Sequence, residues 1–201
     1  MAKRIALLVV VCSTILLGTT AALAGPIAVD RALVVHVRNY ARLTPAMLHL
    51  AMDEVGRIFR RIGILVTWVE GSGSSQRVPR LNLIVLDREI PELREEGRMS
   101  LGAAPRTMER PGRVAYVFHE PIEFLSDVYA VDVALVLANA IAHELAHLLL
   151  PAGHSPDGLM SAFWGARQVR AAVWGTLAFS PSESTLIRAA LEPSDAVMVR
   201  R

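Results

Sequence analysis

Short runs of apolar, often β-branched residues alternate with polar segments along the chain and predict β-strands. Four such runs are found at 32–38, 64–70, 81–87 and 113–118. Between the first two, residues 44–62 place apolar side chains every three or four positions, as on one face of an α-helix. Thr44 is a suitable N-cap, Pro45 follows at the first helical position, and Gly63 ends the pattern. The first part of the chain therefore predicts a strand–helix–strand unit followed by further strands.

Residues 127–150 are apolar almost all round the helical wheel, which predicts a long helix buried at the centre of the molecule. A glycine-interrupted segment, 99–103, predicts a short strand at the edge of the sheet. Later in the chain, Ser180 followed three residues on by Glu183 predicts the capping box of a last helix. The order of these elements predicts an α/β (α+β) fold: a single domain with a twisted mixed sheet, a backing helix over 44–62, a buried central helix and a C-terminal helix.

Residues 1–24 have the pattern of a secretory signal peptide. Lys3 and Arg4 form its basic start, an uncharged apolar stretch follows, and Ala22 to Ala24 supply a small-residue cleavage site. We therefore expect cleavage after Ala24, a folded domain over 25–201, and a secreted or periplasmic protein. The alternative is that the apolar stretch is retained as a membrane anchor, and only in that case do we expect contact with a membrane.

The charge balance of the predicted domain limits the classes of partner that it can bind. The whole chain has 21 basic and 19 acidic residues, so removal of Lys3 and Arg4 leaves 19 of each sign. A neutral domain without a block of basic residues argues against a nucleic-acid partner. The only cysteine, Cys12, lies in the predicted signal peptide, so the domain is expected to fold without disulfides, on its hydrophobic core alone. We expect it to be a monomer.

The polar residues of the predicted central helix form a metal-binding pattern, "HELAHLLLPAGH". His143 and His147 are four positions apart, so on a helix both imidazoles lie on one face and can bind one metal ion. Glu144 points slightly aside, where it can take a proton from a metal-activated water. These three polar side chains are costly to bury in an apolar helix unless they are paired or bind a metal. Imidazole ligands suit Zn²⁺, which is therefore the expected cofactor.

The stretch from His143 to Met160, "HELAHLLLPAGHSPDGLM", resembles the zinc signature of the metzincin metallopeptidases, and its "HS" and "GLM" resemble the matrixins in particular. The resemblance implies a metzincin-like domain and a zinc-dependent endopeptidase, with Glu144 as the general base. It implies that His154 is the third zinc ligand and that Met160, in the Met-turn, forms an apolar floor under the metal. It also implies that the edge strand at 99–103 pairs with an extended peptide or protein substrate.

The pattern departs from the family by one inserted residue. Leu150 stands where metzincins have a glycine, so His154 comes one position late. Pro151 disfavours helical geometry at Leu150, so the helix should end about there, and Gly153 is free to turn the chain back. The span from Leu150 to His154 is long enough to return to the metal. Three histidine ligands would leave the open fourth position that catalytic zinc requires. Asp157 is the alternative third ligand.

Other interpretations stay open. The chain could be a catalytically inactive zinc-binding or interaction protein of the same fold, or a membrane-anchored metalloprotease. Asn139 could support the histidines from one turn earlier, although it fits better as part of the helix's polar stripe. Glu183 could be a downstream metal ligand, although it fits better as a helix cap. Three isolated histidines are interpreted as structural: His36, His49 and His119.

Overall fold

The computed structural model of the chain describes residues 28–70, 80–93, 99–105, 112–151 and 153–192. The predicted signal peptide, 1–24, lies outside these residues. The strands are β1 (Arg31–Asn39), β2 (Ile64–Glu70), β3 (Arg80–Leu86), β4 (Gly102–Ala103) and β5 (Val114–Phe118). The helices are α1 (Pro45–Arg60), α2 (His119–Tyr129), α3 (Val133–His147), α4 (Ala166–Val173) and α5 (Pro181–Ala190), with a 3₁₀ turn at Pro91–Leu93.

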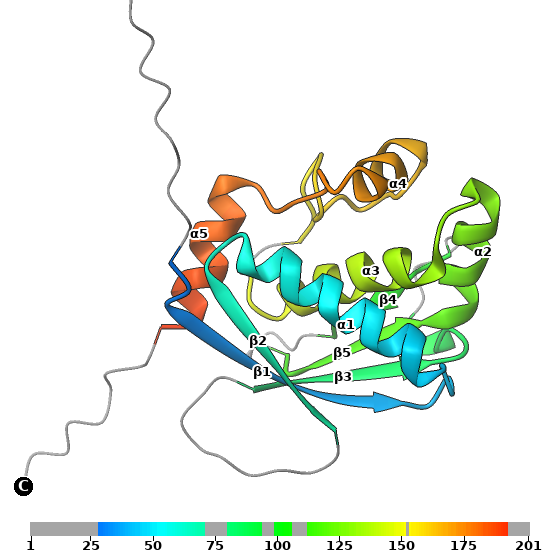
Figure 1. Cartoon of the computed structure of the whole chain (residues 1–201), viewed down its shortest axis with the longest axis horizontal. Helices are drawn as coiled ribbons and strands as arrows, with labels where there is room; N and C mark the ends of the chain where they lie inside the picture. Colours follow the sequence, from blue (N-terminus) through cyan, green and yellow to red (C-terminus); the bar gives the residue numbers. More distant parts are fainter. Residues whose placement is uncertain (1–27, 71–79, 94–98, 106–111, 152, 193–201) are drawn as a thin grey trace, which may run out of the picture.

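The strands form one twisted sheet in the order β2-β1-β3-β5-β4 (Figure 1). Neighbours β2, β1, β3 and β5 run parallel, and β4 pairs antiparallel with β5 at the edge. Helix α1 connects β1 to β2, because parallel neighbours need a crossover connection, which is usually a helix. The structure thus confirms the predicted α/β (α+β) fold class with its mixed sheet, backing helix and C-terminal helix.

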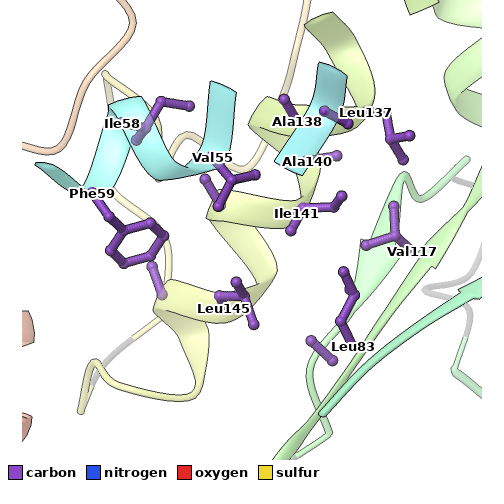
Figure 2. Close-up of a cluster of buried hydrophobic side chains, with 14 of the residues drawn as sticks. Val55, Ile58, Phe59, Leu83, Val117, Leu137, Ala138, Ala140, Ile141 and Leu145 are labelled. Atoms are coloured by element: carbon purple, nitrogen blue, oxygen red, sulfur yellow. The ribbon is translucent and has the colours of Figure 1, made fainter. Parts of the chain in front are cut away.

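The core lies between the sheet and helices α1 and α3, which lie side by side on one face of it (Figure 1). Figure 2 shows the meeting point: Val55 and Phe59 come from α1, Ile141 from α3, and Leu83 and Val117 from β3 and β5. All five side chains are fully buried. Burial of each stabilises the fold by about 1.5–3 kcal/mol. Helix α3 is therefore packed against both the sheet and α1. This packing gives a rigid support to the polar residues at its end.

The caps of the backing helix are those the sequence predicted. The Thr44 hydroxyl accepts a hydrogen bond from the Met47 N–H at 3.3 Å, and Pro45 is the first helical residue. Beyond the other end, Gly63 has a φ of 78°, a conformation that costs glycine little. The predicted bounds of this helix, 44–62, therefore lie within two residues of the observed ones.

The prediction of one long helix over 127–150 was wrong. The chain forms two helices, because Ala130 ends α2 in the left-handed region, with φ 50° and ψ 49°. Asp132 then starts α3, its carboxylate accepting a hydrogen bond from the Ala134 N–H at 2.7 Å. The apolar pattern continues across this break, so periodicity alone does not show it. Asp132, a good N-cap residue, was the available signal.

Two further helices were not predicted, and the ends of two elements differ. Helix α2 begins with "HEP", where Pro121 is tolerated because it lies in the first turn. Helix α4 occupies a segment for which the sequence analysis predicted no helix. Strand β4 has only two residues of the predicted 99–103, and α3 ends at His147, a little before Leu150. In the part of the chain that the structure describes, no helix is long and apolar enough to cross a membrane.

Candidate metal centre

Three imidazoles meet where α3 ends. His143 and His147 lie one turn apart on α3, and His154 returns to them from the loop that follows. The Nε2 atom of His147 lies 2.9 Å from that of His143 and 3.2 Å from that of His154. Among the described residues, these three form the group of side chains that could hold a metal ion. The structure therefore brings together the three predicted ligands, whose roles as ligands stay predictions.

The ring orientation of His143 suits metal binding. Its imidazole is buried, and its Nδ1 lies 2.7 Å from the carbonyl oxygen of Leu159. Because a carbonyl can only accept, Nδ1 must donate, which leaves Nε2 of the neutral ring without a proton. Burial lowers the pKa of His143 to about 4, and the charge of His154 adds to this effect, against the Leu159 hydrogen bond and the Glu183 charge. At neutral pH His143 therefore presents an unprotonated nitrogen to its neighbours.

The spacing of the nitrogens around His147 is compatible with a shared tetrahedral zinc ion. Bonds of roughly 2.0–2.1 Å in tetrahedral geometry set neighbouring ligand nitrogens about 3.3–3.4 Å apart. The two distances at His147, 2.9 and 3.2 Å, are somewhat shorter than this value. A single N–H on His147 could donate to only one of its two neighbours, whereas one cation satisfies all three nitrogens. The donor set of three imidazoles is also one that zinc uses in catalytic sites.

The loop that carries His154 is fixed by backbone contacts. The Ser155 N–H donates to the Met160 carbonyl at 2.8 Å, and Ser155 forms a parallel bridge with Ser161. Gly158 turns the chain with a φ of 79°. Met160 is fully buried, as the resemblance implied for a residue of the Met-turn. The φ of Gly153 involves Ala152, which lies outside the described residues. The extra residue of this loop is thus accommodated without displacing His154 from the other two imidazoles.

Glu144 lies beside the first imidazole, in a site with little access to water. Its side chain is 6 % exposed. Burial raises the pKa of Glu144 to about 8 from an ordinary value of 4.5, because the charged form loses its hydration. A divalent cation at the neighbouring imidazoles would oppose this shift, since a nearby positive charge favours the carboxylate. The arrangement supplies a carboxyl group that exchanges a proton near neutral pH.

We predict that Glu144 makes the stability of the zinc-free protein depend on pH. The folded state holds this proton up to about pH 8, so the contribution of Glu144 to stability is complete below pH 4.5 and is lost as the pH rises to 8. Relative to Glu144→Gln, the wild type should lose about 1.4 kcal/mol per pH unit in this window. Urea unfolding with a chelator present, from pH 5 to 8, measures the difference. His143, whose pKa is lowered, affects stability in the opposite direction, but equally in the wild type and in Glu144→Gln. If the free energy of unfolding of the two proteins changes with pH in parallel, the prediction is wrong.

Gly102 allows the edge strand to lie directly on Glu144. A Cβ at position 102 would be 2.6 Å from Cγ of Glu144 and 2.6 Å from the carbonyl oxygen of Tyr116. Real Cβ atoms do not approach backbone this closely, so the strand would have to move. Only glycine therefore lets β4 cover the carboxylate in the observed arrangement.

We expect Gly102→Ala to destabilise the protein by about 1–3 kcal/mol, the usual cost of overpacking a core. Gly56→Ala is the matched control, because a Cβ there meets nothing within 4 Å and Gly56 lies inside α1. That change should stabilise the protein by about 0.5–1 kcal/mol, since alanine favours helix. Thermal unfolding of the two variants measures both effects. If Gly102→Ala and Gly56→Ala had equal melting temperatures, β4 would move away from Glu144 without a cost in stability.

A cleft of about 640 Å³ opens beside the imidazoles. Its lining comes from the segment of β4, from α2 and α3 through Leu125 and Ala140, and from the loop at 161–165. In that loop Trp164 meets the His143 ring edge-on, with centroids 6.2 Å apart. Apart from the three histidines and Glu144, the described residues that line the cleft carry no charged side chain. The cleft is therefore suited to uncharged, largely apolar groups next to the metal centre.

The alternative site residues lie elsewhere. Asp157 pairs with Arg167 at 2.6 Å and is not part of the histidine group. The Asn139 amide donates to the Leu135 carbonyl of its own helix. Glu183 caps α5, as the capping box predicted, with the Ser180 N–H donating to its carboxylate at 2.7 Å.

The three histidines that were interpreted as structural are also outside the histidine group. His49 is exposed on α1, and His36 is half-buried on β1. His119 starts α2 instead of ending a strand. Sequence patterns placed Gly102 in the substrate-binding edge strand but did not show that it lies against Glu144, and they missed Leu125 in the lining of the cleft, because only the folded chain brings both to α3.

Comparisons with known proteins assign neither a family nor a function to this chain. No family model matches the sequence, and no curated protein matches it. Among solved structures, the chain is similar to metalloproteinase-II from Bacteroides fragilis, with 12% sequence identity and a TM-score of 0.48. The match covers 82% of this chain and 54% of that one, so the chain spans about half the length of the solved protein. What the candidate metal centre can do chemically is therefore inferred from its own residues.

Proposed function

We propose that the protein is a zinc-dependent endopeptidase of the metzincin type. The observation that carries this proposal is the convergence of three imidazole nitrogens beside a buried glutamate, under a sheet edge that borders a cleft. His143, His147 and His154 would hold the zinc ion, which leaves one position open to water or substrate. Glu144 would be the general base. All four side chains line the cleft.

The proposed reaction is hydrolysis of a peptide bond. Zinc at this site would supply a Lewis acid that polarises a carbonyl and lowers the pKa of water. Glu144 takes a proton from the attacking water and passes it to the leaving amine, so it acts first as base and then as acid. Burial raises the pKa of Glu144, and a zinc ion at the imidazoles would lower it again and favour the carboxylate that acts as base.

Substrate binding is proposed at the edge strand. Strand β4 pairs with β5 on one side only and is the last strand of the sheet. An extended peptide can add as a further strand beside such an edge, and its backbone then lies along the cleft. The scissile carbonyl would be presented to the metal centre. We therefore expect peptide or protein substrates in extended conformation.

We also propose that the active protein is a secreted or periplasmic monomer. The pattern of residues 1–24 supports export with cleavage after Ala24, and the catalytic domain would span 25–201. N-terminal sequencing of the protein recovered from cell fractions tests this. A cytosolic protein that retains Met1 would refute it, and an exported protein that retains Met1 would favour a membrane anchor.

The test of the proposed function is a broad peptide library incubated with the purified domain 25–201. We expect cleavage that a zinc chelator abolishes and added zinc restores. Mass spectrometry of the products gives the cleaved bonds and shows whether they lie within the peptides, as for an endopeptidase. A domain that binds zinc but cleaves no peptide would refute the proposal and leave the alternative, an inactive zinc-binding or interaction protein.

A further inference from the structure

The carboxylate of Glu183 makes one contact more than a helix cap requires. In a capping box, the glutamate accepts a hydrogen bond from the N–H of the cap residue. One oxygen, Oε2, does this for Ser180 at 2.7 Å. The other, Oε1, accepts a hydrogen bond from the Ser155 hydroxyl. Glu183 is only 6 % exposed, so both oxygens are satisfied by the protein.

The second contact joins two distant segments at the metal centre. Ser155 is 28 positions before Glu183 in the chain and immediately follows His154. His143 and His147 are positioned by α3, whereas His154 lies on an irregular loop and is exposed. The position of its imidazole therefore depends on what holds the loop. Beside the backbone contacts of Ser155 with Met160 and Ser161, the Ser155 side chain is a further anchor, one residue from His154.

Helix α5 is a firm support for this anchor. The Arg188 guanidinium, about two turns beyond the cap residue Ser180, donates to the Ile62 carbonyl at 3.0 Å and to the Asp30 carboxylate at 2.8 Å. Ile187 is fully buried in the core. These contacts tie α5 to the start of β1 and to the turn before β2, beside which it lies in Figure 1. Because α5 is fixed in this way, the contact of Glu183 with Ser155 attaches the His154 loop to a rigid part of the fold.

We propose that Glu183 is a positioning residue of the metal centre: its hydrogen bond to Ser155 holds His154 against His143 and His147. The inference rests on the proposed metal centre and deepens it. Glu183 does not bind the metal in this proposal, because its two oxygens are used by Ser180 and Ser155. Removal of an outer partner that orients a ligand usually weakens metal binding about 10–100-fold.

The test is zinc affinity, measured by competition with a chelator, for variants of the domain 25–201. We expect Ser155→Ala and Glu183→Ala each to weaken zinc binding by about tenfold or more. The double variant should be no weaker than Glu183→Ala, because both changes break one hydrogen bond. Glu183→Gln should retain affinity, since its amide oxygen can accept from Ser180 and its NH₂ can donate to the Ser155 hydroxyl.

Ser180→Ala is the matched control. The Ser180 hydroxyl accepts from the Glu183 N–H at 3.3 Å, so this change loosens the same cap but leaves the Ser155 contact in place. We expect zinc affinity within about twofold of wild type, since outer-partner losses of 10–100-fold require loss of the orienting contact. The absorption spectrum of the Co²⁺-loaded proteins gives a second measure, because a displaced His154 changes the coordination geometry.

Three results would overturn the inference. Wild-type affinity in both alanine variants would show that Ser155 does not hold His154. An equal loss in Ser180→Ala would assign the effect to helix stability. Absence of zinc binding in the wild type would remove the metal centre as a whole. Zinc binding without peptide cleavage would refute only the endopeptidase function, so the two proposals fail separately.

Discussion

The Glu144→Gln variant is expected to bind zinc like the wild type and to hydrolyse peptides about 10²–10⁴ times more slowly, the usual contribution of general acid–base catalysis. Glutamine has nearly the size of glutamate, so the buried space beside β4 stays filled. It cannot take a proton from water, however, so the base is lost while the three imidazoles are unchanged. The measurements are kcat on a cleaved library peptide and zinc content of the purified variant.

Glu123→Gln is the matched control for this prediction. It makes the same chemical change on α2, where the side chain is exposed and outside the lining of the cleft. We expect its kcat to equal that of the wild type. Retained activity in Glu144→Gln would show that another group activates the water, and the assignment of the general base would be abandoned.

The second large effect concerns the third ligand. We expect His154→Ala to weaken zinc binding by at least about 100-fold, since loss of even an outer partner costs 10–100-fold. Asp157→Ala should bind zinc as the wild type does, because its carboxylate pairs with Arg167 at 2.6 Å and is outside the histidine group. Both side chains lie on the same loop. Each variant is therefore a control that separates loss of a ligand from non-specific disruption of the loop.

Thermal unfolding with zinc at 100 times the wild-type Kd separates these outcomes. Binding then stabilises the wild type and Asp157→Ala by about 2.7 kcal/mol, but His154→Ala by only about 0.4 kcal/mol. For a domain of this size, zinc should raise Tm by about 5–10 °C in the first two and about 1–2 °C in the third. If instead Asp157→Ala loses the zinc-dependent shift and His154→Ala keeps it, the aspartate is the ligand and the histidine assignment is wrong.

Sequence alone determined the features that depend on neighbours in the chain. The spacing of His143 and His147 places both imidazoles on one face of any helix that contains them. Thr44 and Ser180 set the starts of α1 and α5 through hydrogen bonds to residues three positions on. Strand β2 has the predicted bounds, and most of the others differ by one residue. Such signals need only a few consecutive residues, so they can be recognised before the fold is known.

Only the tertiary structure decided what depends on contacts between distant segments. The apolar pattern did not show that α2 and α3 are separate, because both pack on the same core across the turn at Ala130. Spacing left His154 and Asp157 as alternatives, and the path of the loop brought the histidine to the imidazoles. The contacts of Gly102 with Glu144 and of Ser155 with Glu183 join segments 28 or more positions apart. No local pattern encodes such contacts, since they arise only when burial of the core brings sheet, α3 and α5 together.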